Sequence, residues 1–87
     1  MSATPEELRV MLADVLAGIA PEADFDSLEP NKPYREQLDL DSMDFLSLLD
    51  AIETRTGVNI PEADYRKVLT LDGLIAYLQE RGGASAG

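Results

Sequence analysis

The chain has 87 residues with 17 acidic and 7 basic side chains, no cysteine and no histidine, so its formal charge at neutral pH is −10. An acidic surface repels phosphate backbones and gains nothing from counterion release, which excludes nucleic acid as a partner. No stretch of sequence is long and apolar enough to cross a membrane, and the N-terminus lacks the regions of a signal peptide. We expect one small cytoplasmic domain, a monomer without membrane insertion.

The first predicted helix runs from Pro5 to Ile19. Thr4 is its expected N-cap, proline suits the first helical position, and Glu7 stands three residues after the cap, as in a capping box. Pro21 ends the helix. Apolar residues recur at helical spacing, and the expected core face is Leu8, Met11, Leu12, Val15, Leu16 and Ile19.

Residues 20–40 contain Pro21, Pro30 and Pro33 with several turn-forming residues, which predicts a long loop. Leu28 and Leu38 are expected to attach this loop to the core. Eight of the 17 acidic residues lie between positions 22 and 44, so the negative charge is concentrated there.

A second helix is predicted to begin at Asp41–Ser42 and to end at Thr56, where Gly57 supplies a left-handed residue. On a helical wheel, its core face comprises Phe45, Leu46, Leu48, Leu49 and Ile52. The opposite, outward face comprises Met43, Ser47, Asp50 and Thr54.

The C-terminal part of the chain predicts two further helices. After a short extended link, a brief third helix is expected from Pro61 to Val68. Thr70 is the expected cap of the fourth, and Gly82–Gly83 should end it. Its core face is Leu71, Leu74, Ile75 and Leu78.

The predicted fold class is all-α. The expected architecture is a four-helix bundle, with three main helices, one short helix and a long loop between helices one and two. One domain over residues 1–81 would be followed by a flexible tail over residues 82–87.

Ser42 lies between two acidic residues at the predicted start of the second helix. Serine is among the preferred N-cap residues, so its hydroxyl could serve only as a helix cap. Nucleophilic catalysis is not expected, because the chain has no histidine to act as a base. A calcium loop begun at Asp39 would need an oxygen ligand in place of Met43 and glycine in place of Asp44. We therefore predict neither catalytic residues nor a dedicated metal site.

Three segments together resemble the acyl carrier protein family: Asp41-Ser42-Met43-Asp44 with the helix after it, Gly57-Val58-Asn59-Ile60-Pro61-Glu62, and Thr70-Leu71-Asp72-Gly73-Leu74. The similarity covers nearly the whole chain, from the first helix to Leu78. It implies that Ser42 receives 4′-phosphopantetheine from coenzyme A, transferred by a separate phosphopantetheinyl transferase. It also implies a carrier that is not an enzyme, and that moves thioester-linked acyl or similar intermediates between acyl-loading and acyl-processing enzymes of lipid or specialised biosynthesis.

The same resemblance implies a surface for partner enzymes. In the family, the aliphatic residue after the serine contacts partners, and Met43 occupies that position. Asp41 and Asp44 are implied to engage the transferase, and the outward face adds Ser47, Asp50 and Thr54. This chain departs from many fatty-acid carriers in having Asp39 where they have glycine, and in a less acidic outward face, with Arg55 nearby. These departures predict a specialised carrier rather than the general carrier of fatty-acid synthesis.

Two other functions compete with the carrier hypothesis. The first is a helical interaction domain without phosphopantetheine, in which Ser42 only caps a helix. The second is an acid-catalysed hydrolase that uses the loop carboxylates, which would need a cleft for which a small bundle offers little room. The mass of protein expressed with a phosphopantetheinyl transferase distinguishes the carrier from the interaction domain.

Overall fold

A computed structural model describes residues 4–81, which form α-helices and short 3₁₀ helices. In chain order the elements are α1 (Pro5–Ile19), the 3₁₀ turn η1 (Phe25–Ser27), α2 (Tyr34–Leu38), α3 (Ser42–Thr56), the 3₁₀ helix η2 (Glu62–Val68) and α4 (Leu71–Glu80). The predicted all-α bundle is confirmed. The predicted stop at Gly82–Gly83 and the tail lie outside the described residues. Within residues 4–81, no helix has the length and apolar content needed to span a bilayer.

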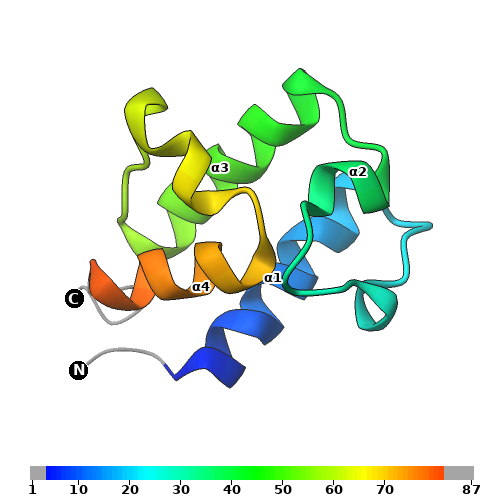
Figure 1. Ribbon diagram of the computed structural model, residues 1–87, viewed down its shortest axis with the longest axis horizontal. Coiled ribbons are helices and arrows are strands. Elements are labelled where there is room, and N and C mark those ends of the chain that lie inside the picture. The colour runs from blue at the N-terminus through cyan, green and yellow to red at the C-terminus, as the bar shows by residue number, and fades with distance from the viewer. Residues whose placement is uncertain (1–3, 82–87) are drawn as a thin grey trace.

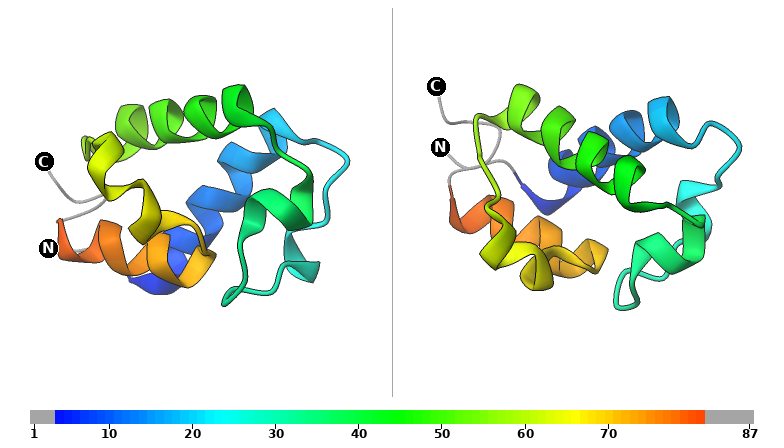
Figure 2. Two further views of the ribbon diagram at one scale, coloured as in Figure 1. Left: turned by 45° about the horizontal axis from the view of Figure 1, so that its top comes forward. Right: turned by 90° about the horizontal axis from the view of Figure 1, so that it is seen from above.

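The helices pack around one aliphatic core. Figure 1 shows α3 and α4 against α1, with η2 next to α4 in the connection from α3. In Figure 2, α2 lies below the start of α3. The most deeply buried side chains are Leu8, Leu12, Tyr34, Leu48, Ile52, Val68, Leu71, Leu74 and Leu78. Each aliphatic side chain among them contributes about 1.5 to 3 kcal/mol by leaving water.

The predicted helix ends are confirmed by their hydrogen bonds. Thr4 and Glu7 form the capping box: the Glu7 N–H donates to Thr4 Oγ1 at 3.1 Å, and the Thr4 N–H donates to Glu7 Oε1 at 2.9 Å. At α4, Thr70 Oγ1 accepts from the Gly73 N–H at 3.0 Å. Gly57 ends α3 with a φ of 75° and donates its N–H to the Glu53 carbonyl. These hydrogen bonds satisfy some of the backbone N–H and C=O groups that have no partner within the helix at its ends.

The segment predicted as a long loop contains α2 and η1, which the sequence pattern did not reveal. Tyr34 is only 1% exposed, and its hydroxyl donates to the Val68 carbonyl. The Tyr34 N–H donates to the Leu69 carbonyl at 3.2 Å. Leu28 is buried and Leu38 packs against the core, as predicted. A five-residue helix is too short to show a hydrophobic period, so its tertiary contacts, above all those of Tyr34, define it.

One further expectation is corrected. The helical wheel places Leu46 on the core face, but its side chain is 48% exposed. The core face of α3 is narrower than predicted and consists of Phe45, Leu48, Leu49 and Ile52, which are spaced at i, i+3, i+4 and i+7. The predicted brief third helix is present as η2, Glu62–Val68, and it has 3₁₀ geometry, which is common in short connecting helices.

Candidate functional site

The first turn of α3 is capped by Asp41, not by Ser42. Asp41 Oδ1 accepts from the Asp44 N–H at 2.8 Å, and Asp44 Oδ2 accepts from the Asp41 N–H at 3.4 Å. The interpretation of Ser42 as the cap is therefore wrong. Aspartate caps a helix as well as serine does, and only Asp41 has a side-chain acceptor three residues further on that can complete a capping box.

Ser42 is the first residue of α3, and its side chain is exposed. Its hydroxyl makes no hydrogen bond to a residue within 4–81. The backbone N–H groups of a first helical turn have no partner within the helix, and in α3 the Asp44 N–H donates to Asp41. An anion at such an exposed site gains about 0.3 to 1 kcal/mol from the helix dipole, while the charges of Asp41 and Asp44 oppose it.

The outward face of α3 is exposed as predicted. Met43 is 72% exposed, and Ser47, Asp50 and Thr54 are exposed as well. Leu46 lies next to Met43 on this exposed surface, because residues three apart are neighbours on a helix. The spacing of three residues from Met43 was the only sequence signal that Leu46 could belong to the outward face. Met43 and Leu46 therefore form an exposed apolar pair beside Ser42.

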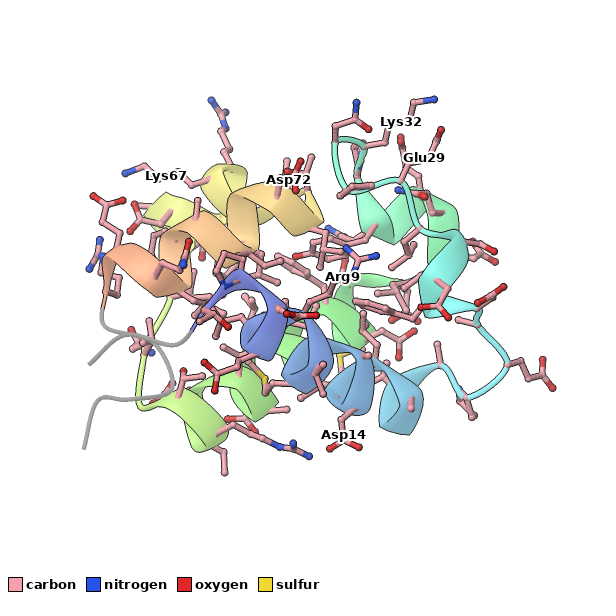
Figure 3. The ribbon with its side chains drawn as sticks, turned by 90° about the horizontal axis from the view of Figure 1, so that it is seen from below. Arg9, Asp14, Glu29, Lys32, Lys67 and Asp72 are labelled. Carbon is pink, nitrogen blue, oxygen red and sulfur yellow. The ribbon has the colours of Figure 1, made fainter. Side chains whose placement is uncertain are left out.

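Arg55, near the outward face in the sequence, serves the fold. Its guanidinium contacts the Asp14 carboxylate of α1 at 2.5 Å, and this ion pair links α1 to α3. Asp14 is labelled on α1 in Figure 3. Arg55 is consequently not a free charge for a partner enzyme.

A groove of about 390 Å³ adjoins Ser42. Its lining comes from α2, α3, η2 and the residue after η2, and consists of Arg35, Ser42, Phe45, Leu46, Glu62, Tyr65, Arg66 and Leu69. The Arg35 guanidinium lies over the Phe45 ring at 4.9 Å, and the Tyr65 ring packs edge-on against Phe45 at 5.3 Å. Apart from Ser42, these residues were absent from the predicted site, because nothing in the sequence shows that short elements converge there.

The acidic loop forms a shallow groove rather than a catalytic cleft. This groove, of about 760 Å³, lies between the end of α1 and α2 and includes Glu22, Asp24 and Asp39. All three residues are exposed, so the groove does not enclose them as a catalytic cleft would. Among residues 4–81, no group of three potential metal-ligating side chains converges on one point.

Comparisons with known proteins agree with this geometry. The family model described as "Phosphopantetheine attachment site" matches residues 6–78. The chain is 31% identical over 83 residues to the meromycolate extension acyl carrier protein of Mycolicibacterium smegmatis, covering 92% of this chain and 80% of that protein. It is 29% identical over 79 residues to the acyl carrier protein of Renibacterium salmoninarum, covering 87% of this chain and 93% of that protein.

The chain belongs to the acyl carrier protein family, and it carries 4′-phosphopantetheine as a covalent prosthetic group. The predicted family, carrier function and cofactor are thereby confirmed. Members of this family are carriers and not catalysts, and they interact with phosphopantetheinyl transferases and acyl-processing enzymes. The family match overturns the interaction domain without phosphopantetheine, and it does not support the hydrolase.

Proposed function

We propose that Ser42 is the attachment residue and that the chain shuttles thioester-linked acyl intermediates between enzymes of lipid biosynthesis. The observation that carries this proposal is the division of roles at the start of α3. Asp41 caps the helix, which leaves the adjacent Ser42 hydroxyl exposed and without a hydrogen-bond partner in the described chain. The relative named for meromycolate extension favours a lipid cargo.

Attachment requires the Ser42 oxygen to form a bond to the β-phosphorus of coenzyme A while the bond to the 3′,5′-ADP leaving group breaks. The hydroxyl proton must pass to a base. This chain has no histidine, and the Asp41 carboxylate is engaged by the Asp44 N–H. The base is therefore supplied by the transferase, and this chain contributes an accessible hydroxyl on a rigid helix end.

The test is modification of matched serine variants. Ser47 is the control because it is exposed on the same helix. After co-expression with a phosphopantetheinyl transferase, the parent and Ser47→Ala should show the mass of the added arm, and Ser42→Ala should not. Modification of Ser42→Ala would end the assignment.

The exposed pair Met43 and Leu46 is proposed as the apolar contact for partner enzymes, with Asp41 and Asp44 steering them by charge. Met43→Ala should weaken transferase binding to a similar degree at low and high salt. Asp44→Asn keeps an acceptor for the cap but removes the charge, so it should weaken binding mainly at low salt. Dissociation constants measured at two ionic strengths separate these effects, and identical salt dependence of the two variants would contradict them.

The weakly acidic outward face supports a specialised carrier. Ser47 and Thr54 stand where many fatty-acid carriers have glutamate, and both are exposed. Ser47→Glu combined with Thr54→Glu, with Arg55 kept because it pairs with Asp14, should improve turnover by general fatty-acid-synthesis enzymes. Equal turnover of the parent and double variant would show that this face does not set partner choice.

A further inference from the structure

A broad groove and a narrow hollow adjoin one another where α1 ends. The groove, of about 760 Å³, is the one that contains Glu22, Asp24 and Asp39, and apolar side chains complete much of its lining. The hollow, of about 70 Å³, is lined by alanine, leucine and phenylalanine side chains alone, contributed by α1, the loop after it, η1 and α2. Both are lined by Ala20, Ala23 and Leu38, so the hollow is an apolar extension of the groove.

The charge of this groove has one sign. Its three carboxylate residues are exposed, and its lining includes neither lysine nor arginine. The ion pairs of the described chain use other carboxylates, those of Asp14, Glu29 and Asp64. Arg9 lies over the Phe25 ring at 5.2 Å but lines neither the groove nor the hollow. The groove therefore complements a cationic ligand, and it repels a second copy of this chain, whose formal charge is −10.

Hydrogen bonds within the chain hold both walls of the groove. On one wall, the Asp24 carboxylate accepts from the Asp26 N–H at 3.1 Å and from the Ser27 hydroxyl at 2.7 Å. On the other, the Gln37 side chain of α2 accepts from the Glu29 N–H at 2.7 Å and donates to the Glu29 carbonyl at 3.0 Å. A ligand that enters the groove does not have to order these walls, which lowers the entropic cost of binding.

The groove lies near Ser42. Asp39 at its edge precedes Ser42 by three residues, which span at most about 11 Å of chain. Figure 2 shows the end of α1, α2 and the start of α3 at the same end of the molecule. A protein bound at the start of α3 can therefore also reach the groove.

We propose that this groove is a further docking site for partner proteins, and that it binds a basic segment that carries one apolar side chain. The carboxylates of Glu22 and Asp39, which make no ion pair or hydrogen bond in the described chain, meet the cations of the segment. The apolar side chain enters the hollow beside Ala17. Binding in the groove does not depend on attachment at Ser42, so the groove and the arm can be tested separately.

The test uses the complete chain and short synthetic peptides. The probe peptide has one leucine between two pairs of lysines, and a comparison peptide has alanine in place of the leucine. Glu22→Gln/Asp39→Asn removes two charges from the groove, and asparagine tolerates the left-handed backbone at this position. Glu6→Gln/Glu80→Gln is the matched control, because both residues are exposed, lack an ion pair in the described chain and lie on the first turn of α1 and the last residue of α4.

Backbone amide resonances locate the peptide, and their titration gives dissociation constants. The probe should shift resonances of residues 20–24 and 37–39, equally in the parent and in Ser42→Ala, and sodium chloride should weaken its binding. Glu22→Gln/Asp39→Asn should raise the dissociation constant roughly fivefold, and Glu6→Gln/Glu80→Gln by less than about twofold. Intact mass reports arm addition to the same proteins, so failure of the proposed function is distinguishable from failure of docking.

The hollow is tested by a larger side chain at Ala17, an exposed helical residue that lines it. Ala17→Leu should fill part of the hollow and bring the affinity of the probe down to that of the alanine peptide, because the peptide leucine then stays in water. Ala76→Leu is the control, since Ala76 is an exposed alanine on α4 that lines neither the groove nor the hollow. Urea midpoints establish that each variant is folded, and the two charge variants decide the case if Ala17→Leu is not.

Three results overturn the proposal. The first is a probe that shifts resonances of α3 and leaves those of the groove unchanged. The second is an equal loss of affinity in the two charge variants, since the peptide would then respond only to net charge. The third is equal binding of the leucine and alanine peptides to the parent, which would mean that no apolar side chain enters the hollow.

Discussion

Two regions where a helix begins differ in the hydrogen bonding of their polar groups. One is the start of α3, and the other is the junction of α2 with the segment that precedes α4. At the junction, the Tyr34 hydroxyl and N–H both donate to carbonyls of the segment before α4, and Thr70 caps α4. At the start of α3, Asp41 caps the helix and the next residue, Ser42, has an exposed hydroxyl without a described partner.

This contrast shows where stability and accessibility come from in a small carrier. A buried polar group must be hydrogen-bonded, so the junction holds the loop and the helices in one arrangement. An exposed hydroxyl that no fold contact requires can be modified without loss of structure. Substitutions that damage one region and leave the other intact therefore test whether the two roles are separate.

The largest loss of stability is expected at Tyr34. Tyr34→Ala should cost about 3 to 5 kcal/mol because it leaves a cavity in a small core. Tyr34→Phe keeps the ring and removes the donor to the Val68 carbonyl, and should cost about 1 to 3 kcal/mol. Urea unfolding measures both losses. The folded Tyr34→Phe variant should still accept the arm, and unfolding of Tyr34→Phe at the parent's midpoint would contradict the role given to this hydroxyl.

A smaller effect, dependent on pH, is expected at Asp64. Its carboxylate accepts from the Tyr77 hydroxyl at 2.6 Å and contacts Lys67 and Arg81 at 3.4 Å, which joins η2 to α4. The hydrogen bond from Tyr77, with help from the two cations, lowers the pKa of Asp64 in the folded state. A lowered folded-state pKa favours folding above the unfolded-state value, and this contribution disappears as pH falls through the folded-state value.

Melting temperatures across the acid range test this expectation. The parent should lose stability as pH falls below the ordinary aspartate range, and Asp64→Asn should be less stable at neutral pH with a shallower acid dependence. Glu62→Gln is a control, because Glu62 is exposed at the start of the same 3₁₀ helix. Parallel pH profiles of the parent and Asp64→Asn would show that this carboxylate does not hold η2 on α4.

The smallest effect is expected at Asp39, which has a φ of 55° in the left-handed region. Glycine adopts this conformation freely, and aspartate tolerates it better than most residues do. Asp39→Gly should change the free energy of unfolding by less than about 1 kcal/mol, whereas Asp39→Ala should lose about 1 kcal/mol. If alanine and glycine gave equal stability, backbone conformation would not explain the residue choice here.

The conformation of Asp39 also revises one argument drawn from the sequence. Many fatty-acid carriers have glycine at this position, and the departure from glycine is one of the two reasons to expect a specialised carrier. The left-handed backbone gives the position a conformational requirement that aspartate meets. The proposal of a specialised carrier therefore rests on the outward face of α3 alone.

The parts of the fold that could be predicted from the sequence are those set by residues close to one another along the chain. The starts of α1 and α4 and the end of α3 followed from capping signals in the sequence, and the core faces of these helices from long helical periods, with Leu46 the exception. Neither α2 nor the arginine-lined groove could be predicted, because contacts between distant segments define both.

The choice of capping residue at the start of α3 could not be predicted from the sequence either. Asp41 and Ser42 are both good capping residues, so their types alone did not decide which one caps. The hydrogen bond from the Asp44 N–H decided it. Because this hydrogen bond makes Asp41 the cap, the Ser42 hydroxyl is not needed for capping and stays accessible.

The separation of cap and attachment residue is tested most simply by measuring unfolding free energy and completed arm addition for Asp41→Ala and Ser42→Ala side by side. Asp41→Ala should lose about 0.5 to 2 kcal/mol, as expected for a lost cap, and should still accept the arm when the reaction reaches completion. Ser42→Ala should unfold within about 0.5 kcal/mol of the parent and should accept no arm. The reverse pattern, in which Ser42→Ala destabilises the fold like a lost cap or is still modified, would contradict this division of roles.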